Sequence, residues 1–237
     1  MERLDKVLSG TGRWSRREVK ELVRRGRVLL DGVPAASPEQ KIDPETADIR
    51  VDGETVSCRR FTYVLLHKPA GVLSAVEDSR QRTVLDLLPQ ELKRQGLSPV
   101  GRLDKDTEGL LLLTDDGELT HRLLSPKYHV DKVYYARVDG VPDAADAAAF
   151  AAGLLLGDGL QCLPAKLELL GGDACLVTLR EGKFHQVKRM LASRGKPVLY
   201  LKRLAMGPLT LEDTLPAGQC RPLTEEEISA LRCACGV

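Results

Sequence analysis

The chain has 237 residues, of which 43% are hydrophobic and 29% charged, so the composition excludes wholesale disorder and allows a buried core. The length exceeds that of a typical single domain and predicts two domains. The formal net charge of +1 does not indicate a polyanionic partner, so any such signal must come from local clusters of charge.

The first unit is expected over residues 3–56, in the order helix, helix, strand, strand. Ser15 and Glu18 have the S-x-x-E spacing of a capping box, and the helix that they begin should end at Gly26. Three apolar residues then fall on one face of this helix: Val19, Leu22 and Val23. Short strands are expected at 28–30 and 49–51, each followed by an Asp-Gly turn.

A short linker is expected near Cys58, Arg59 and Arg60, so the predicted domains cover residues 1–58 and 63–237. The second domain should alternate between strands and helices. Expected strands lie at 63–66, 110–114, 133–138, 176–179 and 198–202, and expected helices at 118–124, 143–152 and 185–193. This alternation by itself favours parallel strand–helix–strand units.

No segment of the sequence predicts a membrane span. The first thirty residues are charged throughout, and no run of about 18 apolar residues occurs. The six cysteines are scattered, and the one close pair has the spacing C-x-C. We therefore expect a cytoplasmic protein with reduced thiols, no structural metal and no contact with a membrane.

Basic residues gather on the second helix of the first unit. Between Arg13 and Arg27 there are seven Lys or Arg residues against two acids. Those at steps of three and four residues line one side of the helix, and the candidates for contact with RNA are Arg16, Arg17, Lys20, Arg24 and Arg27. Charge alone is equally typical of a solvated surface face. A more specific indication comes from the sequence pattern.

That pattern is R-L-D-K over 3–6, S-R-R over 15–17 and G-R-V over 26–28. It resembles the alpha-L RNA-binding module of ribosomal small-subunit protein four, an S4-like domain, across about residues 1–50. The resemblance implies that the basic helix and the following strand lie on the RNA backbone. Such contacts position an RNA without specifying its sequence.

The most informative stretch is G-R-L-D-K-D-T-E-G-L over 101–110, which continues as L-L-L-T to residue 114. It predicts a carboxylate-rich loop between glycines that leads into a buried strand. Asp104 in such a loop could be a nucleophile, a general base or a metal ligand. Asp106 and Glu108 are expected to be solvated, and Asp115 and Asp116 to form a turn that caps the next helix.

This stretch resembles the signature of ribosomal RNA pseudouridine synthases of the RsuA and RluB type. Two further motifs agree in type and order, K-V-Y over 132–134 and E-G-K-F-H-Q-V-K-R-M over 181–190, as does the ending R-P-L-T-E-E-E-I over 221–228. The resemblance implies an α+β fold: an S4-like domain and a catalytic domain whose mixed, mainly antiparallel central sheet is crossed by a cleft. It also implies catalysis without a cofactor.

The resemblance implies three catalytic roles. Asp104 is the nucleophile, Tyr134 stacks on the target base, and Lys188 is the cation beside the carboxylate. Tyr134 and Tyr135 should face opposite sides of their strand, because side chains alternate. On the helix at 185–193, Val187, Met190 and Leu191 should form the buried side and leave Lys188 elsewhere.

Further residues are expected to contact RNA. Arg102 is the candidate to fill the gap left when the uridine leaves its stack, and Leu201 the candidate to pack near the base. His185, Gln186 and Arg189 of the third motif are candidates for RNA contact, although His185 could equally cap the helix and Leu201 could be plain core.

The form H-Q-V-K-R-M over 185–190 favours the small-subunit enzyme, whose target is uridine 516 of 16S ribosomal RNA, as naked RNA or in an assembling subunit. Three alternatives remain open: a large-subunit (23S) synthase of the same family, a noncatalytic RNA-binding assembly protein, and a metal site for phosphodiester cleavage built from Asp104, Asp106, Asp115 and Asp116. We expect a monomer.

Overall fold

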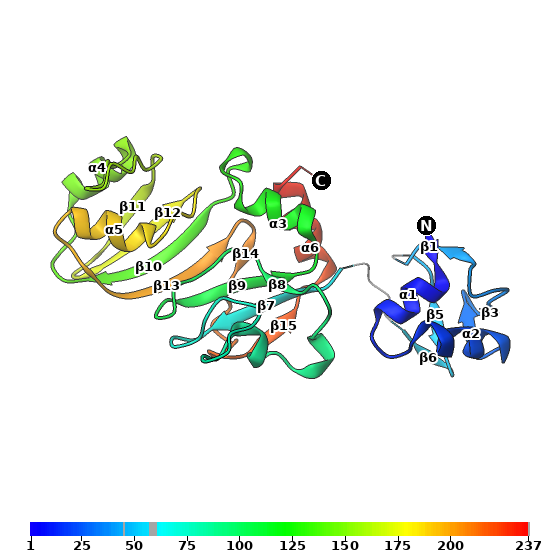
Figure 1. Ribbon diagram of the computed structural model, residues 1–237. Coiled ribbons are helices and arrows are strands. Elements are labelled where there is room, and N and C mark those ends of the chain that lie inside the picture. Colours follow the sequence, from blue (N-terminus) through cyan, green and yellow to red (C-terminus); the bar gives the residue numbers. More distant parts are fainter. Residues whose placement is uncertain (45, 57–60, 237) are drawn as a thin grey trace. The chain divides into compact units, whose positions relative to one another are not determined.

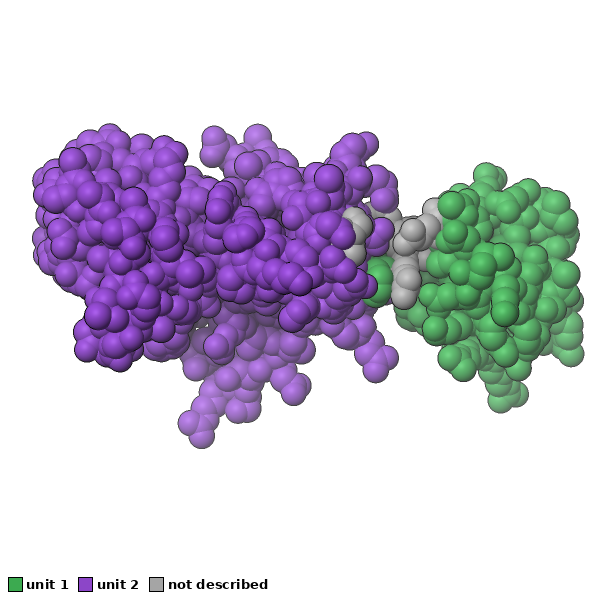
Figure 2. All heavy atoms as spheres, turned by 90° about the horizontal axis from the view of Figure 1, so that it is seen from above, with its two compact units in different colours: residues 1–62 green, residues 63–237 purple. Residues whose placement is uncertain are grey.

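The computed structural model of the protein describes residues 1–44, 46–56 and 61–236. The chain divides into two compact units, Met1–Thr62 and Tyr63–Val237 (Figures 1 and 2). The linker expected at 58–60 lies outside the described residues. Among those residues, no helix is long and apolar enough to cross a membrane.

The first unit packs two helices against short strands. Ser15 Oγ accepts from the Glu18 N–H at 3.3 Å, and Glu18 Oε2 accepts from the Ser15 N–H at 2.7 Å, which confirms the capping box. Val19 and its two partners are buried in the core as expected. The elements are β1 (Glu2–Arg3), α1 (Leu4–Gly10), α2 (Arg16–Arg24), β2 (Val28–Leu30), β3 (Val33–Pro34), β4 (Lys41–Ile42), β5 (Ile49–Val51) and β6 (Glu54–Thr55).

The second unit is built on one large sheet. Its strands are β7 (Tyr63–Lys68), β8 (Ser98–Pro99), β9 (Glu108–Thr114), β10 (Lys132–Val138), β11 (Lys166–Gly171), β12 (Ala174–Leu179), β13 (Val198–Met206), β14 (Leu209–Thr210) and β15 (Cys220–Pro222). Its helices are η1 (Val84–Leu87), η2 (Gln90–Leu92), α3 (Gly117–Leu124), η3 (Pro126–Tyr128), α4 (Ala144–Ala152), α5 (Gln186–Ser193) and α6 (Glu225–Ala234). Figure 1 shows α4 and α5 near β11 and β12, and α3 beside α6.

The strand order in this sheet is β11-β12-β10-β13-β9-β7-β15, with β14 paired to β13 and β8 to β9. Every named pair is antiparallel except β13 with β9, which is parallel. The mainly antiparallel sheet implied by the resemblance is therefore confirmed. The parallel units favoured by the alternation of elements are wrong, because β11–β12 is a tight hairpin and most other sequential strands pair antiparallel or are separated by another strand.

The parallel pair at the centre of the sheet depends on a glycine. Lys202 pairs with Glu108 and Arg203 with Gly109. A Cβ on Gly109 would lie 2.2 Å from the Arg203 carbonyl oxygen and 2.5 Å from its nitrogen, and Gly109 has φ +110°. Only glycine lets the two strands approach this closely. The loop that carries Asp104 enters the sheet at this point.

Candidate active site

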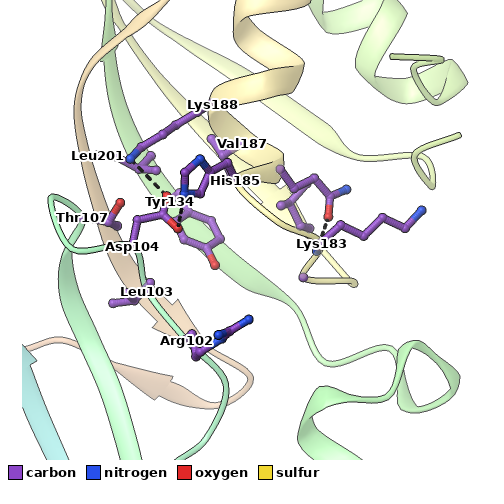
Figure 3. A pocket seen from close by; sticks show the side chains of 13 residues that line it. Arg102, Leu103, Asp104, Thr107, Tyr134, Lys183, His185, Val187, Lys188 and Leu201 are labelled. Atoms are coloured by element: carbon purple, nitrogen blue, oxygen red, sulfur yellow. Dashed lines mark hydrogen bonds and ion pairs between the residues drawn. The ribbon is translucent and has the colours of Figure 1, made fainter. Parts of the chain in front are cut away.

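A pocket opens on the sheet at β10 and β13, beside the loop that precedes β9 (Figure 3). We refer to it as the Asp104 pocket. Side chains from widely separated segments line it: the loop before β9, β10, the turn before α5, α5 itself and β13. Seven residues expected at the site line it: Arg102, Asp104, Tyr134, His185, Gln186, Lys188 and Leu201.

The loop that carries Asp104, residues 101–107, is fastened to the segment after β7. Ser74 Oγ donates to the Leu103 carbonyl at 2.8 Å and accepts from the Leu103 N–H at 3.1 Å. The Gly71 N–H donates to the Lys105 carbonyl at 2.7 Å. These bonds hold the backbone on both sides of Asp104, so the carboxylate is presented from a fixed loop.

Lys68 is the third residue that binds this loop, and its side chain is fully buried. Its ammonium donates to the carbonyls of Pro69 at 2.9 Å, Lys105 at 3.2 Å and Thr107 at 2.9 Å. Burial lowers the pKa of Lys68 to about 8, although the carboxylates of Asp106, Glu108 and Asp104 act in the opposite direction. None of the sequence motifs contains this residue. The sequence offers one signal, a lysine at the end of a strand that begins with four buried apolar residues.

Lys188 lies between two carboxylates. Its Nζ is 3.0 Å from Asp104 Oδ2 and 2.5 Å from Asp106 Oδ1. Burial by itself lowers the pKa of Lys188, but the bonds to Asp106 and Asp104 outweigh it and the pKa is raised. The bond from Lys188 holds the pKa of Asp106 below its usual value. The ammonium thus stays charged at neutral pH beside Asp104.

Asp106 is solvated as expected, with its side chain 73% exposed, and it is also bonded to Lys188. Glu108 is half-buried and accepts from the Tyr200 hydroxyl at 2.7 Å. Asp116 caps α3 as expected, since its Oδ1 accepts from the Leu119 N–H. No metal-binding group of three or more His, Cys, Asp or Glu occurs among the described residues, so these acids are not gathered into one cluster.

His185 occupies the N-cap position of α5 without capping it through its side chain. Its backbone is left-handed, with φ 48° and ψ 34°. The ring stacks on Phe184 and puts Nε2 3.4 Å from Asp104 Oδ1. The His185 side chain therefore does not cap the helix but lies beside the carboxylate.

Tyr134 and Leu201 form an apolar wall of the pocket, with exposed fractions of 8% and 5%. Tyr135 lies on the other side of β10, where its ring meets Tyr200 edge to face at 6.2 Å. The alternation of the two tyrosines is as expected. The ring of Tyr134 and the carboxylate of Asp104 face the same space in Figure 3.

The remaining third-motif candidates have other partners. The Gln186 amide is buried, donates to Glu181 Oε1 and accepts from the Lys183 N–H, so its polar atoms already have partners inside the protein, and the residue also lines the Asp104 pocket. Arg189 forms an ion pair with Asp158 outside the Asp104 pocket. Val187, Met190 and Leu191 form the buried side of α5 as predicted.

Arg102 lines the mouth of the pocket and is exposed. In the first unit all five basic candidates are exposed as well. Three of them pair with acids: Lys20 with Glu39, Arg24 with Glu21, and Arg27 with Asp52. For Arg16 and Arg17, the described part of the chain contains no ion pair within 4.0 Å.

The arrangement offers a carboxylate with a permanent cation, an aromatic wall and an open mouth with an arginine. Such a site can bind a planar ring against Tyr134 and bring a reacting carbon to Asp104. It can also hold negative charge beside Lys188.

Comparison with known proteins identifies the same two parts. A family model described as RNA pseudouridylate synthase matches residues 62–193, and an S4 domain model matches residues 2–47. A crystal structure of a pseudouridylate synthase, 35% identical, superposes with a TM-score of 0.68 and covers 98% of this chain and 100% of its own.

Three curated relatives match over nearly their whole length. An uncharacterized RNA pseudouridine synthase of Bacillus subtilis is 48% identical, over 97% of this chain and 98% of the relative. The ribosomal small subunit pseudouridine synthase A of Vibrio cholerae is 40% identical, over 97% and 99%. The ribosomal large subunit pseudouridine synthase B of Bacillus subtilis is 38% identical, over 98% and 96%.

Proposed function

The chain belongs to the RNA pseudouridylate synthase family, and we propose that it isomerises one uridine of ribosomal RNA with Asp104 as the nucleophile. The observation that carries this proposal is the position of Asp104, held on a fixed loop beside the Lys188 ammonium and opposite the Tyr134 ring. A carboxylate held beside an ammonium, in a pocket suited to a nucleobase, fits an attack on a nucleoside.

Isomerisation breaks the bond between the ribose anomeric carbon and N1 of uracil and forms a bond from that carbon to C5. The proton on C5 is lost and N1 gains one, so the reaction needs neither an oxidant nor an energy source. Asp104 can add to the anomeric carbon as uracil leaves, add to C6 of the base, or assist a glycal route. Each route uses the carboxylate of Asp104, which the Lys188 ammonium contacts at 3.0 Å.

In this proposal Tyr134 holds the uracil by stacking, and the apolar side of Leu201 packs beside it. A uridine inside folded RNA must leave its stack to reach Asp104. Arg102 is exposed at the mouth of the pocket and can fill the space that the uridine leaves in the stack. Its guanidinium can stack on the adjacent bases and form an ion pair with a phosphate.

For the substrate we propose small-subunit RNA, at uridine 516 of the 16S molecule. The support is the third-motif form H-Q-V-K-R-M at 185–190, together with the 40% identity to a small-subunit synthase. A relative named for the large subunit is 38% identical, so overall identity favours neither and 23S RNA is the second candidate.

The test is to incubate the protein with 16S and 23S RNA, each as naked transcript and as subunit particle, and to map pseudouridine chemically. Pseudouridine at uridine 516 of 16S RNA alone is the expected result. Modification confined to 23S RNA would contradict the small-subunit assignment and leave the chemistry intact. No modification of any of the four substrates would contradict the proposal that the target is ribosomal.

A further inference from the structure

An aromatic side chain stands exposed beside the Asp104 pocket. Phe184 lies in the turn just before α5 and is 73% exposed. An exposed phenylalanine does not contribute the folding free energy that burial of its apolar surface would provide. An exposed ring next to a functional pocket is therefore a candidate for binding a partner.

The ring is held in place by its neighbour. Phe184 and His185 stack with centroids 3.9 Å apart and an angle of 16° between their planes. The left-handed backbone of His185, φ 48°, is rare outside glycine, and such conformations cluster at binding sites. Since His185 Nε2 is 3.4 Å from Asp104 Oδ1, Phe184 lies one ring away from the carboxylate.

A second hollow, of about 550 Å³, adjoins Phe184 outside the Asp104 pocket. We name it the Phe184 hollow. Leu156 and Ala192 contribute apolar surface to it, and the ion pair between Arg189 and Asp158 lies at its edge. Because Asp158 already neutralises Arg189, the hollow is poorly suited to a phosphate. A ring face with one donor and one acceptor nearby suits a nucleobase.

We propose that the Phe184 hollow binds a second, unpaired nucleobase of the RNA, close in sequence to the uridine at Asp104 and stacked on Phe184. The identity of the nucleotide at Asp104 rests on the proposed function. When a uridine leaves its stack, the base next to it loses a stacking partner. That base can then stack on an aromatic side chain. Two bases held on either side of His185 would fix the RNA strand across the site.

The test uses the full chain with Asp104→Asn, a variant expected to bind RNA without turnover. It is titrated into short single-stranded RNAs that contain one uridine and carry 2-aminopurine at a single flanking position, moved stepwise along the strand. Stacking should quench 2-aminopurine fluorescence at one position only. Adding Phe184→Ala should abolish that quenching and weaken binding roughly five- to 150-fold, the range expected when one base–aromatic stack is removed.

Phe184→Tyr should keep the quenching, because the ring is retained. Leu170→Ala is the control: it removes an apolar side chain that is 52% exposed and lines neither the Asp104 pocket nor the Phe184 hollow. This variant should bind RNA as tightly as the protein with Leu170. Quenching that does not depend on Phe184, or an equal weakening with Leu170→Ala, would overturn the proposal. Tritium release from C5-labelled ribosomal RNA, measured with Asp104 intact, tests the proposed function separately. Tritium release without Phe184-dependent quenching would contradict the second base site and leave the proposed function intact.

Discussion

Lys188 is shared between Asp104 and Asp106, and this sharing decides how firmly the proposed nucleophile is held. The Nζ to Oδ distances are 3.0 Å to Asp104 and 2.5 Å to Asp106. The raised pKa of Lys188 keeps the ammonium charged well above neutral pH, and the lowered pKa of Asp106 keeps that carboxylate charged in mild acid. Lys188 and Asp106 therefore remain an ion pair beside Asp104 across the neutral range.

Replacing Lys188 by Met should lower kcat/KM about a hundredfold, since a charged partner of the reacting group is removed. Lys188→Arg keeps the charge and should restore part of the rate. Initial rates of tritium release measure both effects, and an unchanged rate in Lys188→Met would contradict the assigned role.

Single residues were predictable where they belong to a local pattern. Asp104, Tyr134 and Lys188 lie in recognisable strings of sequence, whereas the partnership of Lys188 with Asp106 joins residues 82 apart and has no local signature. Lys68 was missed for the same reason, because its partner carbonyls at 105 and 107 lie 37 and 39 residues away. The sequence likewise does not reveal that the Gln186 amide has hydrogen-bond partners inside the protein.

At the scale of elements, the contact between β9 and β13 positions the Asp104 loop. Gly109→Ala should destabilise the fold by at least about 2 kcal/mol, because its Cβ would overlap the Arg203 backbone at a positive φ. Gly117→Ala is the matched control: nothing lies within 4 Å of its Cβ. Urea unfolding of both variants measures the difference, and equal stability would contradict the close approach.

Lys68 links β7 to the Asp104 loop, and its charge should matter for activity. The folded pKa of about 8 lies below the ordinary value of about 10.4, so the folded chain releases this proton first as pH rises. Between those values the unfolded chain binds more protons, so this group makes stability rise with pH. Activity should instead fall above about pH 8, because a neutral amine binds the carbonyls of Lys105 and Thr107 more weakly.

In Lys68→Met, activity should be lower at every pH and should no longer fall above about pH 8. The variant should also lose about 1–3 kcal/mol of stability, because the carbonyls that Lys68 binds are left unpaired. Lys132→Met provides the comparison. Lys132 is also buried, with a pKa lowered to about 8, but it binds the carbonyls of Leu123 and Val130. The Lys132→Met variant should be less stable than the unmodified protein, but its activity should still fall above about pH 8. Tritium release against pH and urea unfolding measure the pair, and identical pH profiles would refute the link.

Most long elements were predictable from periodicity. The helices at 118–124, 143–152 and 185–193 and the strands at 110–114 and 133–138 match α3, α4, α5, β9 and β10 to within two residues at each end. The pairing of strands was not predictable, because hydrophobic pattern does not say which strand is the neighbour. The edge strand β11 and the short strands β14 and β15 were missed, since two or three residues carry too little pattern and β11 is largely exposed.

At the scale of the whole molecule, a net charge of +1 conceals a basic helix in the first unit. Arg16 and Arg17 lie on its exposed surface, and the described residues provide neither with an ion pair within 4.0 Å. Their charges are therefore available to phosphate, whereas those of Lys20, Arg24 and Arg27 are partly neutralised. The first unit should contribute affinity for RNA rather than catalysis.

Replacing Arg16 and Arg17 by Gln should weaken RNA binding and reduce the slope of log affinity against log salt by about 0.7–0.9 for each phosphate that the arginines no longer neutralise. Single-turnover release of tritium at saturating protein should be unchanged. Arg137→Gln, in the second unit and already paired with Asp173, should leave the salt slope as it is. A salt slope unaffected by the Arg16 and Arg17 replacements would argue against RNA binding at this helix.

The most direct measurement is release of tritium from ribosomal RNA labelled at C5 of uridine, compared between Asp104→Asn and Asp106→Asn. Both variants remove one carboxylate that binds Lys188, so they differ only in which carboxylate is replaced. We predict that Asp104→Asn loses at least about a thousandfold in rate and that Asp106→Asn loses less than about tenfold. Comparable rates for Asp104→Asn and the unmodified protein would contradict the assignment of Asp104 as the nucleophile.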